Sequence, residues 1–149
     1  VALYLKNVLH QLGKGLAHPE AKTKTSMALF FEAVDSNPQQ WIFMIAERWG
    51  GSEVVRKAIA REIDFLNDDL ANALKKFEVI ANFHDENDLK VITNILINLS
   101  FTWAMSWINL SRQYSGIELE LQKMVLKKQS VTQIRLIFKG IENWDRDKA

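Results

Sequence analysis

Residues 91–111, VITNILINLSFTWAMSWINLS, decide the fold because no charged residue occurs between Lys90 and Arg112. Wound as a helix at about 100° per residue, this stretch places its apolar side chains on two separate faces. One face contains Ile92, Leu96, Leu99, Trp103, Trp107 and Leu110. The second face contains Ile97, Phe101, Ala104 and Ile108. Between the two faces runs a stripe of small neutral polar residues: Asn94, Asn98, Thr102, Ser106 and Asn109.

A helix with no charged face has no side that is suited to water, so this stretch predicts a buried central helix. We expect one apolar face to lie in the core of its own subunit and the other to be covered by a partner subunit. A pocket is an alternative cover for the polar stripe. A membrane span is also an alternative, since the stretch is long enough to cross a bilayer. Unpartnered asparagine amides are costly in hydrocarbon, however, and the neighbouring helices are amphipathic, so the sequence favours a buried helix and no membrane partner.

The composition is that of one soluble globular domain. The chain has 149 residues, of which 48% are hydrophobic and 25% charged, and this is enough for a substantial core. Because there is no cysteine, disulfides, thiolate metal sites and cysteine nucleophiles are excluded, and the chain is suited to the cytoplasm. A net charge of +1 gives no argument for binding nucleic acid or a membrane surface.

Apolar residues at helical spacing predict an all-α domain of about six helices. The expected ranges are 1–16, 19–35, 38–49, 52–77, 91–111 and 116–144. The acids of residues 84–88 are best explained as a cap before the central helix, where the helix dipole favours negative charge. Other start signals are Asn37 with Gln40, Ser52, and Ser115 with Glu118.

No constellation of residues predicts catalysis or metal binding. The histidines His10, His18 and His84 lie in different segments, and none has a second ligand at metal spacing. No serine stands in a nucleophile-elbow sequence, and the paired acids Asp68 and Asp69 lie on or beside the wet side of a helix. We therefore expect no enzyme activity, no metal and no cofactor.

Large apolar side chains are abundant, with five Trp and eight Phe. Aromatics and Met beside neutral Asn, Thr and Ser suit a pocket for an apolar ligand, and a packed core is the alternative for any one of these residues. The side chains that could enclose such a pocket are Phe30, Phe31, Trp41, Met44, Phe65, Phe101, Trp103 and Met105.

The turn after the third expected helix resembles that of TetR-type transcriptional regulators, and within them the branch that represses unsaturated fatty-acid biosynthesis. The resemblance extends over about residues 1–146. The positions that carry it are residues 47–52 (ERWGGS), Arg56, Ala58, residues 60–63 (AREI), Asn37 with Pro38, Lys139 with Gly140, and Trp144.

The resemblance implies that residues 1–149 are the effector-binding and dimerisation domain of a repressor. An N-terminal helix-turn-helix domain, which binds DNA in this family, would precede Val1 and is absent from this chain. The first helix here begins without a start signal, in agreement with missing upstream sequence. The helices over 91–111 and 116–144 would form a four-helix interface in a homodimer. The expected interface residues are Ile97, Ala104, Ile108, Ile134, Phe138 and Ile141.

The same resemblance implies an apolar small-molecule effector, with a fatty acyl thioester as the expected class. A ligand between the second, third, fourth and central helices would shift the first helix and so change operator affinity. The expected pocket residues are Phe30, Trp41, Met44, Phe65, Phe101 and Met105, and Phe101 is also a candidate for the interface. Arg48 or Arg61 would meet an acidic headgroup, with Glu47 or Glu62 as alternative partners. The alternative function is a helical dimerisation scaffold with a solid core and no ligand.

Overall fold

The computed structural model of the chain describes residues 21–75, 85–145 and 147. They form the helices α2 (Ala21–Ser36), α3 (Pro38–Gly50), α4 (Glu53–Leu74), α5 (Glu86–Gln113) and α6 (Gly116–Glu142). No strand occurs within these ranges, which confirms the predicted all-α class. Each of these helices overlaps a predicted range, whereas the helix expected over residues 1–16 lies outside the described residues.

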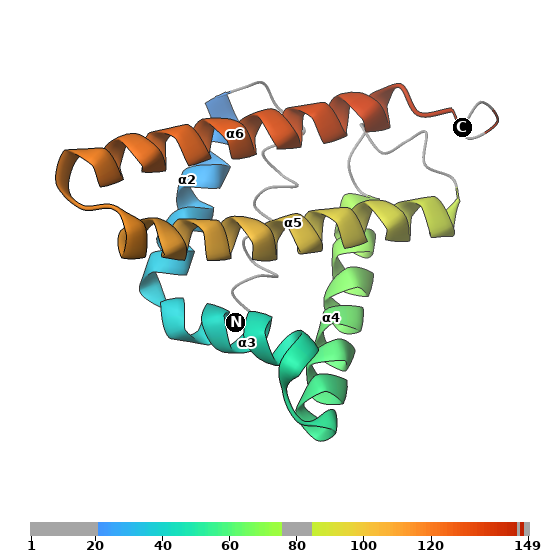
Figure 1. The fold of residues 1–149 in the computed structure, drawn as a ribbon. Helices are drawn as coiled ribbons and strands as arrows, with labels where there is room; N and C mark the ends of the chain where they lie inside the picture. Colours follow the sequence, from blue (N-terminus) through green and yellow to red (C-terminus); the bar gives the residue numbers. More distant parts are fainter. Residues whose placement is uncertain (1–20, 76–84, 146, 148–149) are drawn as a thin grey trace.

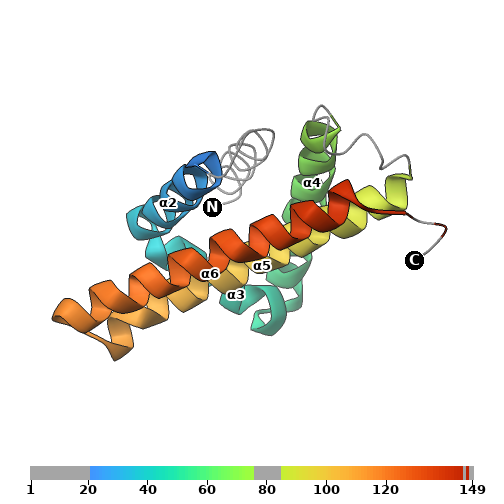
Figure 2. The ribbon, with the colours of Figure 1, turned by 90° about the horizontal axis from the view of Figure 1, so that it is seen from above.

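Helix α5 is the centre of the fold. It runs antiparallel to α6; α2 and α4 lie on one side of this pair, and α3 crosses beneath α5 (Figure 1, Figure 2). It contacts each of the other described helices, as the uncharged stretch predicted. By length and composition alone α5 is the one described helix that could cross a membrane, but half of its most apolar window is buried inside the protein. Such burial is typical of the core helix of a globular domain.

Both apolar faces of α5 are covered by helices of the same chain. The second face is therefore buried within its own chain, because α5 has neighbouring helices on several sides, and the interface expected at this face stays a prediction. Its outward side contains most of the polar stripe together with Val91 and Ile95, which are 56% and 40% exposed. The buried side chains are Leu96, Trp103 and Trp107 of the first face and Ile97, Phe101, Ala104 and Ile108 of the second.

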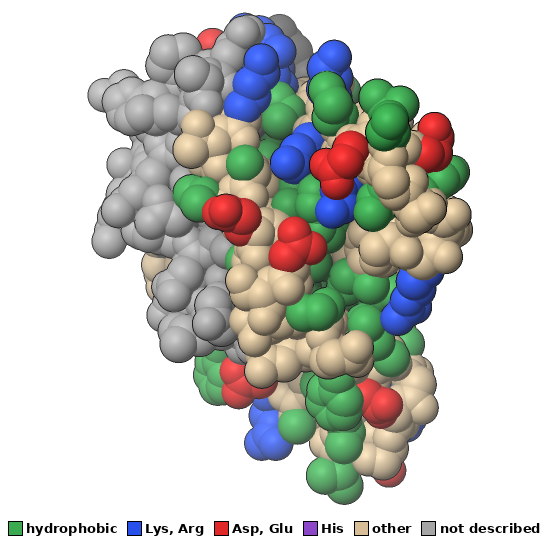
Figure 3. All heavy atoms as spheres, turned by 90° about the vertical axis from the view of Figure 1, so that its left-hand side faces the viewer, with side chains coloured by type: hydrophobic (Ala, Val, Ile, Leu, Met, Phe, Trp, Pro, Cys, Tyr) green, Lys and Arg blue, Asp and Glu red, His purple; other side chains and the backbone are tan. Residues whose placement is uncertain are grey.

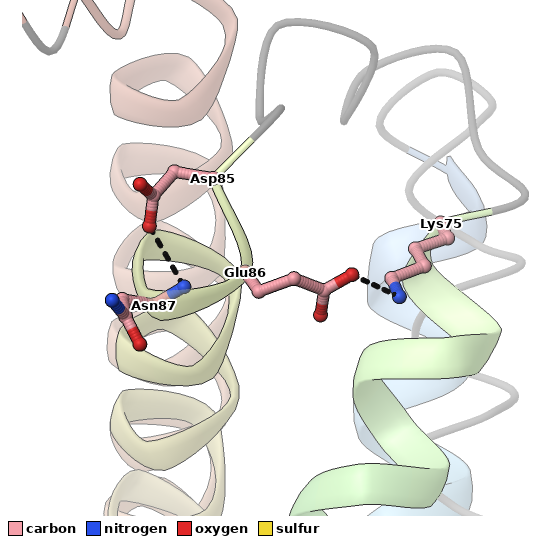
Figure 4. A network of polar contacts seen from close by, with 4 residues as sticks. All are labelled: Lys75, Asp85, Glu86 and Asn87. Atoms are coloured by element: carbon pink, nitrogen blue, oxygen red, sulfur yellow. Dashed lines mark hydrogen bonds and ion pairs between the residues drawn. The ribbon is translucent and has the colours of Figure 1, made fainter.

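The start of α5 is fixed by the acids around it. The Asp85 carboxylate accepts hydrogen bonds from the backbone N–H groups of Asn87 at 2.8 Å and Asp88 at 3.2 Å, so the predicted cap is confirmed. Glu86 forms an ion pair with Lys75, which directly follows α4 (Figure 4). Because the first N–H groups of a helix have no partner within the helix, these acids stabilise the helix start and join it to the end of α4.

The other predicted helix starts differ in their chemistry. The Ser52 hydroxyl accepts a backbone hydrogen bond from the first turn of α4 at 3.3 Å, as predicted. The capping boxes at Asn37 and Ser115 are wrong, because neither side chain makes a capping hydrogen bond. The start of α6 instead depends on Gly116, whose φ of +58° is tolerated because glycine has no Cβ. Glu118 accepts a hydrogen bond from a side chain one turn later and not from the helix start.

Candidate functional site

Helix α3 separates two grooves. Phe43 and Met44 of α3 line a groove that α3 forms with α4, whereas Ile45, Arg48 and Trp49 line a groove that it forms with α5. The sequence of α3 is apolar around nearly its whole circumference, so each side can pack against a different helix. We name the two sites the α3/α4 groove and the α3/α5 groove.

The α3/α4 groove is open and mostly apolar. Its volume is about 810 Å³, which is within the range of small-molecule pockets. Met44 and Ile59 are its buried members, and its aromatic members, Phe43 and Phe65, are 58% and 63% exposed. Two phenyl rings in water beside an apolar floor are typical of a surface that binds a partner or ligand. The remaining lining residues are Gln39, Gln40, Ala58, Arg61 and Glu62.

The α3/α5 groove has a volume of about 410 Å³ and a cation in it. The Arg48 guanidinium donates a hydrogen bond to Asn98 Oδ1 at 2.8 Å. The guanidinium carbon also lies 4.7 Å from the ring centroid of Trp49 and 5.2 Å from that of Phe101, so two rings hold the charge in place. The rest of the lining is Ile45, Met105 and the polar residues Thr102, Ser106 and Asn109. The polar stripe of α5 therefore lines a groove, which was the alternative predicted for it.

Arg48 has no carboxylate partner among the described residues. Partial burial lowers the pKa of its guanidinium below the usual range of arginine, because a buried charge loses hydration energy. An arginine nevertheless stays protonated in a protein. The predicted alternative in which Arg48 pairs with Glu47 does not occur, and Arg61 likewise forms no ion pair with Glu62.

The residues predicted to bind ligand fall into three groups. Met44 and Phe65 line the α3/α4 groove, and Arg48, Phe101 and Met105 line the α3/α5 groove. Phe30 and Trp41 are fully buried and line neither groove. Because α3 lies between the grooves, these side chains do not share one of them. Sequence reasoning missed Phe43, for which the only signal is its position beside Met44 on an α3 that is apolar nearly all round.

Phe30 and Trp41 form part of a solid aromatic cluster at the centre of the domain. The ring centroid of Trp41 lies 5.7 Å from that of Phe30 and 6.3 Å from that of Phe101. Both rings are completely shielded from solvent. The indole N–H of Trp41 has no hydrogen-bond acceptor within the described ranges, although buried donors normally have one. Through this cluster α3 packs on both α2 and α5.

The residues predicted for the dimer interface are all buried within the single chain. They pack α5 and α6 against the rest of the domain and leave almost no surface for a second subunit. These residues are Ile97, Ala104, Ile108, Ile134, Phe138 and Ile141. Exposed apolar side chains occur instead on the outward sides of the two helices, at Val91 and Ile95 of α5 and at Val125 and Leu136 of α6.

Further apolar side chains are exposed at the end of the molecule where α5 turns into α6. Figure 3 shows them among basic and acidic side chains on this end. The first half of α6 contributes Ile117, Leu121 and Met124 to the exposed apolar surface. A third groove, of about 440 Å³, lies between α2 and α6. Its basic lining residues are Lys24, Lys127, Lys128 and Arg135.

Metal binding finds no support in the part of the chain that the structure describes, where no group of His, Cys, Asp and Glu could hold an ion. The three histidines all lie outside the described ranges.

The arrangement of the five described helices agrees with a comparison against known families. Residues 19–137 match the family model described as the tetracyclin repressor-like C-terminal domain. The chain belongs to this TetR-type family. Members of the family are generally regulators that dimerise and bind small-molecule effectors, and they are generally not enzymes. No solved structure gives a significant match to the chain.

Proposed function

We propose that this TetR-type domain is the effector-sensing and dimerisation part of a repressor and that it binds a long acyl chain in the α3/α4 groove. The observation that supports this ligand best is the pair of exposed phenyl rings, Phe43 and Phe65, that border a groove with an apolar floor. Covering apolar surface is favourable by roughly 25 cal/mol per Å², so a ligand that covers both rings gains affinity from each.

The shape of the groove suits an acyl chain with a polar head. An unbranched chain would lie along Met44 and Ile59 between the two rings, and each buried CH₂ would contribute about 0.8 kcal/mol. Polar groups at the same groove, Gln39 and Arg61, are available to a thioester carbonyl or an anionic headgroup. Arg61 is exposed and forms no ion pair with a described residue, so it is accessible to such a headgroup.

Signalling requires that the ligand bind two conformations of the domain with different affinity. A chain inserted between α3 and α4 would separate or reorient these helices, and α3 also contacts α2 and α5. A change at the α3/α4 groove therefore reaches the layer of α5 and α6 through direct packing. In the proposed regulator this movement is passed on to a DNA-binding domain and changes operator affinity.

Dimerisation would use the outward face of α5 and α6. The Trp103 indole donates to Gln133 at 2.6 Å, which joins the two antiparallel helices. Their outward sides include Ile95 of α5 and Leu136 of α6. These apolar side chains are 40% and 66% exposed, and Val125 on the same side of α6 is 47% exposed. The α5 stretch beside them contains no charge to desolvate. The side chains first predicted for the interface would form the layer directly beneath this face.

The ligand proposal is tested by filling the groove. Ala58 lies in the α3/α4 groove, whereas Ala60 lies on α4 outside it and is exposed. Hexadecanoyl-coenzyme A titrated calorimetrically into Ala58→Trp should bind at least about tenfold more weakly than to the wild type, because the indole would take the place of the chain. Ala60→Trp adds the same side chain elsewhere and should bind like the wild type.

A second variant guards against an effect of misfolding. Phe65 is largely exposed, so Phe65→Ala should leave the free energy of unfolding within about 0.5 kcal/mol of the wild type while still weakening the acyl ligand. Unchanged affinity in both Ala58→Trp and Phe65→Ala would reject the α3/α4 groove as the acyl site.

The dimer proposal is tested by placing a charge on the outward face. Val125→Glu should shift the chain toward monomer in sedimentation equilibrium, because an unpaired carboxylate would be buried in the interface. Val54→Glu places the same charge at the exposed start of α4 and serves as the matched control. A wild-type chain that is monomeric at high concentration would contradict this proposal.

The solid Phe30–Trp41 cluster favours one alternative, a dimerisation scaffold without a ligand. The two functions predict different results in the same calorimetric experiment. A scaffold would dimerise through α5 and α6 and give no heat of binding with acyl probes of any length.

A further inference from the structure

We infer that the α3/α5 groove is a second, separate binding site, in which Arg48 and the amides of Asn98 and Asn109 receive the carboxylate of a small apolar acid. This inference goes beyond the acyl site and does not depend on it, because the two grooves have no lining residue in common.

The argument begins with an excess of hydrogen-bond donors. Asn98 uses its side-chain oxygen to accept from Arg48 at 2.8 Å, and Asn109 uses its oxygen to accept from Arg112 at 3.4 Å. Each amide therefore keeps its NH₂ group for another acceptor, and no described residue supplies one. The Ser106 hydroxyl also has no partner among the described residues. A carboxylate has only acceptors, up to about four lone-pair sites, and so complements these donors.

The charge of the groove also favours a carboxylate as the bound group. No acidic residue lines the groove, and Arg48 is its one lining cation among the described residues. Partial burial removes part of the hydration of this guanidinium and so lowers its pKa. A bound anion would replace the lost hydration, and one cation is matched by one negative charge. A monocarboxylate fits this balance better than a phosphate dianion does, and it can accept two parallel hydrogen bonds from a guanidinium.

The apolar lining of the groove indicates which kind of group the carboxylate is attached to. Trp49 and Phe101 flank the guanidinium, and Ile45 and Met105 extend the apolar wall. Aromatic rings on Arg48 restrict its rotation, so less conformational entropy is lost when an anion binds. The volume of about 410 Å³ is at the lower end of the range for ligand pockets. The occupant is therefore a small acid with a hydrocarbon or aromatic body.

The probe for this site is octanoate, with octanol as the neutral molecule of the same chain length. Octanoate should bind the wild-type chain at least about tenfold more tightly than octanol does, because hydrogen bonds to a charged partner are the stronger ones. Arg48→Gln keeps a hydrogen-bonding side chain and removes the charge, and it should lower octanoate affinity by about tenfold or more. Titration calorimetry measures both affinities.

The matched control is Arg61→Gln, which removes the same charge from the α3/α4 groove. Octanoate affinity should be unchanged in this variant. The carboxylate site is rejected if Arg48→Gln binds octanoate as tightly as the wild type does. It is also rejected if octanol binds as tightly as octanoate in Ala58→Trp, where the indole fills the α3/α4 groove. Loss of octanoate affinity in Arg61→Gln alone would assign the anion to the other groove and also overturn the inference.

A carboxylate could also come from an acidic side chain of a second copy of this chain, because the groove adjoins the outward face of α5. Sedimentation equilibrium of Arg48→Gln separates the two sources. An unchanged dimer constant with weakened octanoate binding supports the small acid. A weakened dimer with unchanged octanoate binding would make Arg48 an interface residue and overturn the inference. These results are distinguishable from the acyl-site test, since Ala58→Trp leaves the α3/α5 groove untouched.

Discussion

The two sides of α3 are made from one short helix but have opposite chemistry. On the α4 side, Phe43 and Phe65 border an open groove with an apolar floor. On the α5 side, Arg48 lies between two aromatic rings in a groove about half as large, at 410 Å³ against 810 Å³, and lined by amides and hydroxyls. The buried Trp41 of α3 lines neither groove and packs on Phe30 and Phe101.

This difference follows from the helices that α3 meets. The α4 residues that face it belong to an amphipathic helix, which supplies an apolar stripe with charges only at its borders. The α5 residues that face it belong to the neutral polar stripe, which supplies hydrogen-bonding groups without charge. One helix can therefore present a hydrocarbon site and an anion site, provided that its own core residues stay rigid.

The largest expected effect is on the free energy of unfolding and comes from removing the buried indole of α3. Trp41→Ala should lower the free energy of unfolding by about 3–5 kcal/mol, because it removes a fully buried indole that packs on Phe30 and Phe101. Urea denaturation measures the change. Trp49→Ala is the matched control on the same helix, and because Trp49 is 76% exposed its effect should stay within about 1 kcal/mol. Similar losses of unfolding free energy in both variants would show that the buried packing of Trp41 does not account for its effect.

The next largest effect is the dependence of affinity on the length of a neutral chain, which should distinguish the apolar α3/α4 groove from the charged α3/α5 groove. Lengthening a neutral probe from octanol to decanol should tighten binding to the wild type by about fourfold per CH₂, since each buried CH₂ contributes about 0.8 kcal/mol. Displacement of the fluorescent probe N-phenyl-1-naphthylamine measures these affinities. The gain should disappear in Ala58→Trp and persist in Arg48→Gln. A gain that persists in Ala58→Trp would place the chain outside the α3/α4 groove.

The sequence predicted much of what positions these grooves. The missing charge between Lys90 and Arg112 was enough to place α5 at the centre of the fold, and Asp85 was predicted as its cap. These features are local, because periodicity and capping depend on neighbouring residues. The same patterns did not predict that α3 would divide the ligand residues. A helix that is apolar nearly all round, such as α3, gives no indication of which side meets α4 and which meets α5.

The predicted dimer interface is a second case in which the sequence pattern did not identify the neighbouring element. Apolar periodicity correctly marked Ile97, Ile108 and Ile134 as buried, but it could not say whether their own chain or a partner covers them. The exposed side chains on the outward face, Val125 and Leu136, lie on α6 away from its regular apolar stripe. Burial is a property that a pattern predicts, whereas the identity of the covering element depends on the tertiary arrangement.

A smaller effect separates the grooves by their response to salt. Octanoate bound at Arg48 should lose about two- to threefold in affinity between 0.05 and 0.5 M sodium chloride, because the guanidinium is partly buried and only partly screened. Octanol has no charge to screen, so its affinity should stay constant or increase slightly. Calorimetric titrations at the two salt concentrations give this comparison. Equal salt dependence for the two probes would remove the electrostatic distinction between the sides.

The smallest expected effect concerns the exposed arginine of the α3/α4 groove. Arg61→Gln should weaken hexadecanoyl-coenzyme A by no more than about threefold at low salt, because an exposed ion pair contributes only about 0.2–1 kcal/mol. At 0.5 M salt the variant and the wild type should bind equally. Glu62→Gln, the matched neutralisation next to it, should instead leave affinity unchanged or slightly improved, since it removes a negative charge near an anionic headgroup. A tenfold or larger loss of affinity in Arg61→Gln would mean that the ligand buries this guanidinium. The α3/α4 groove would then be an anion site as well. In that case the two grooves would differ in size alone.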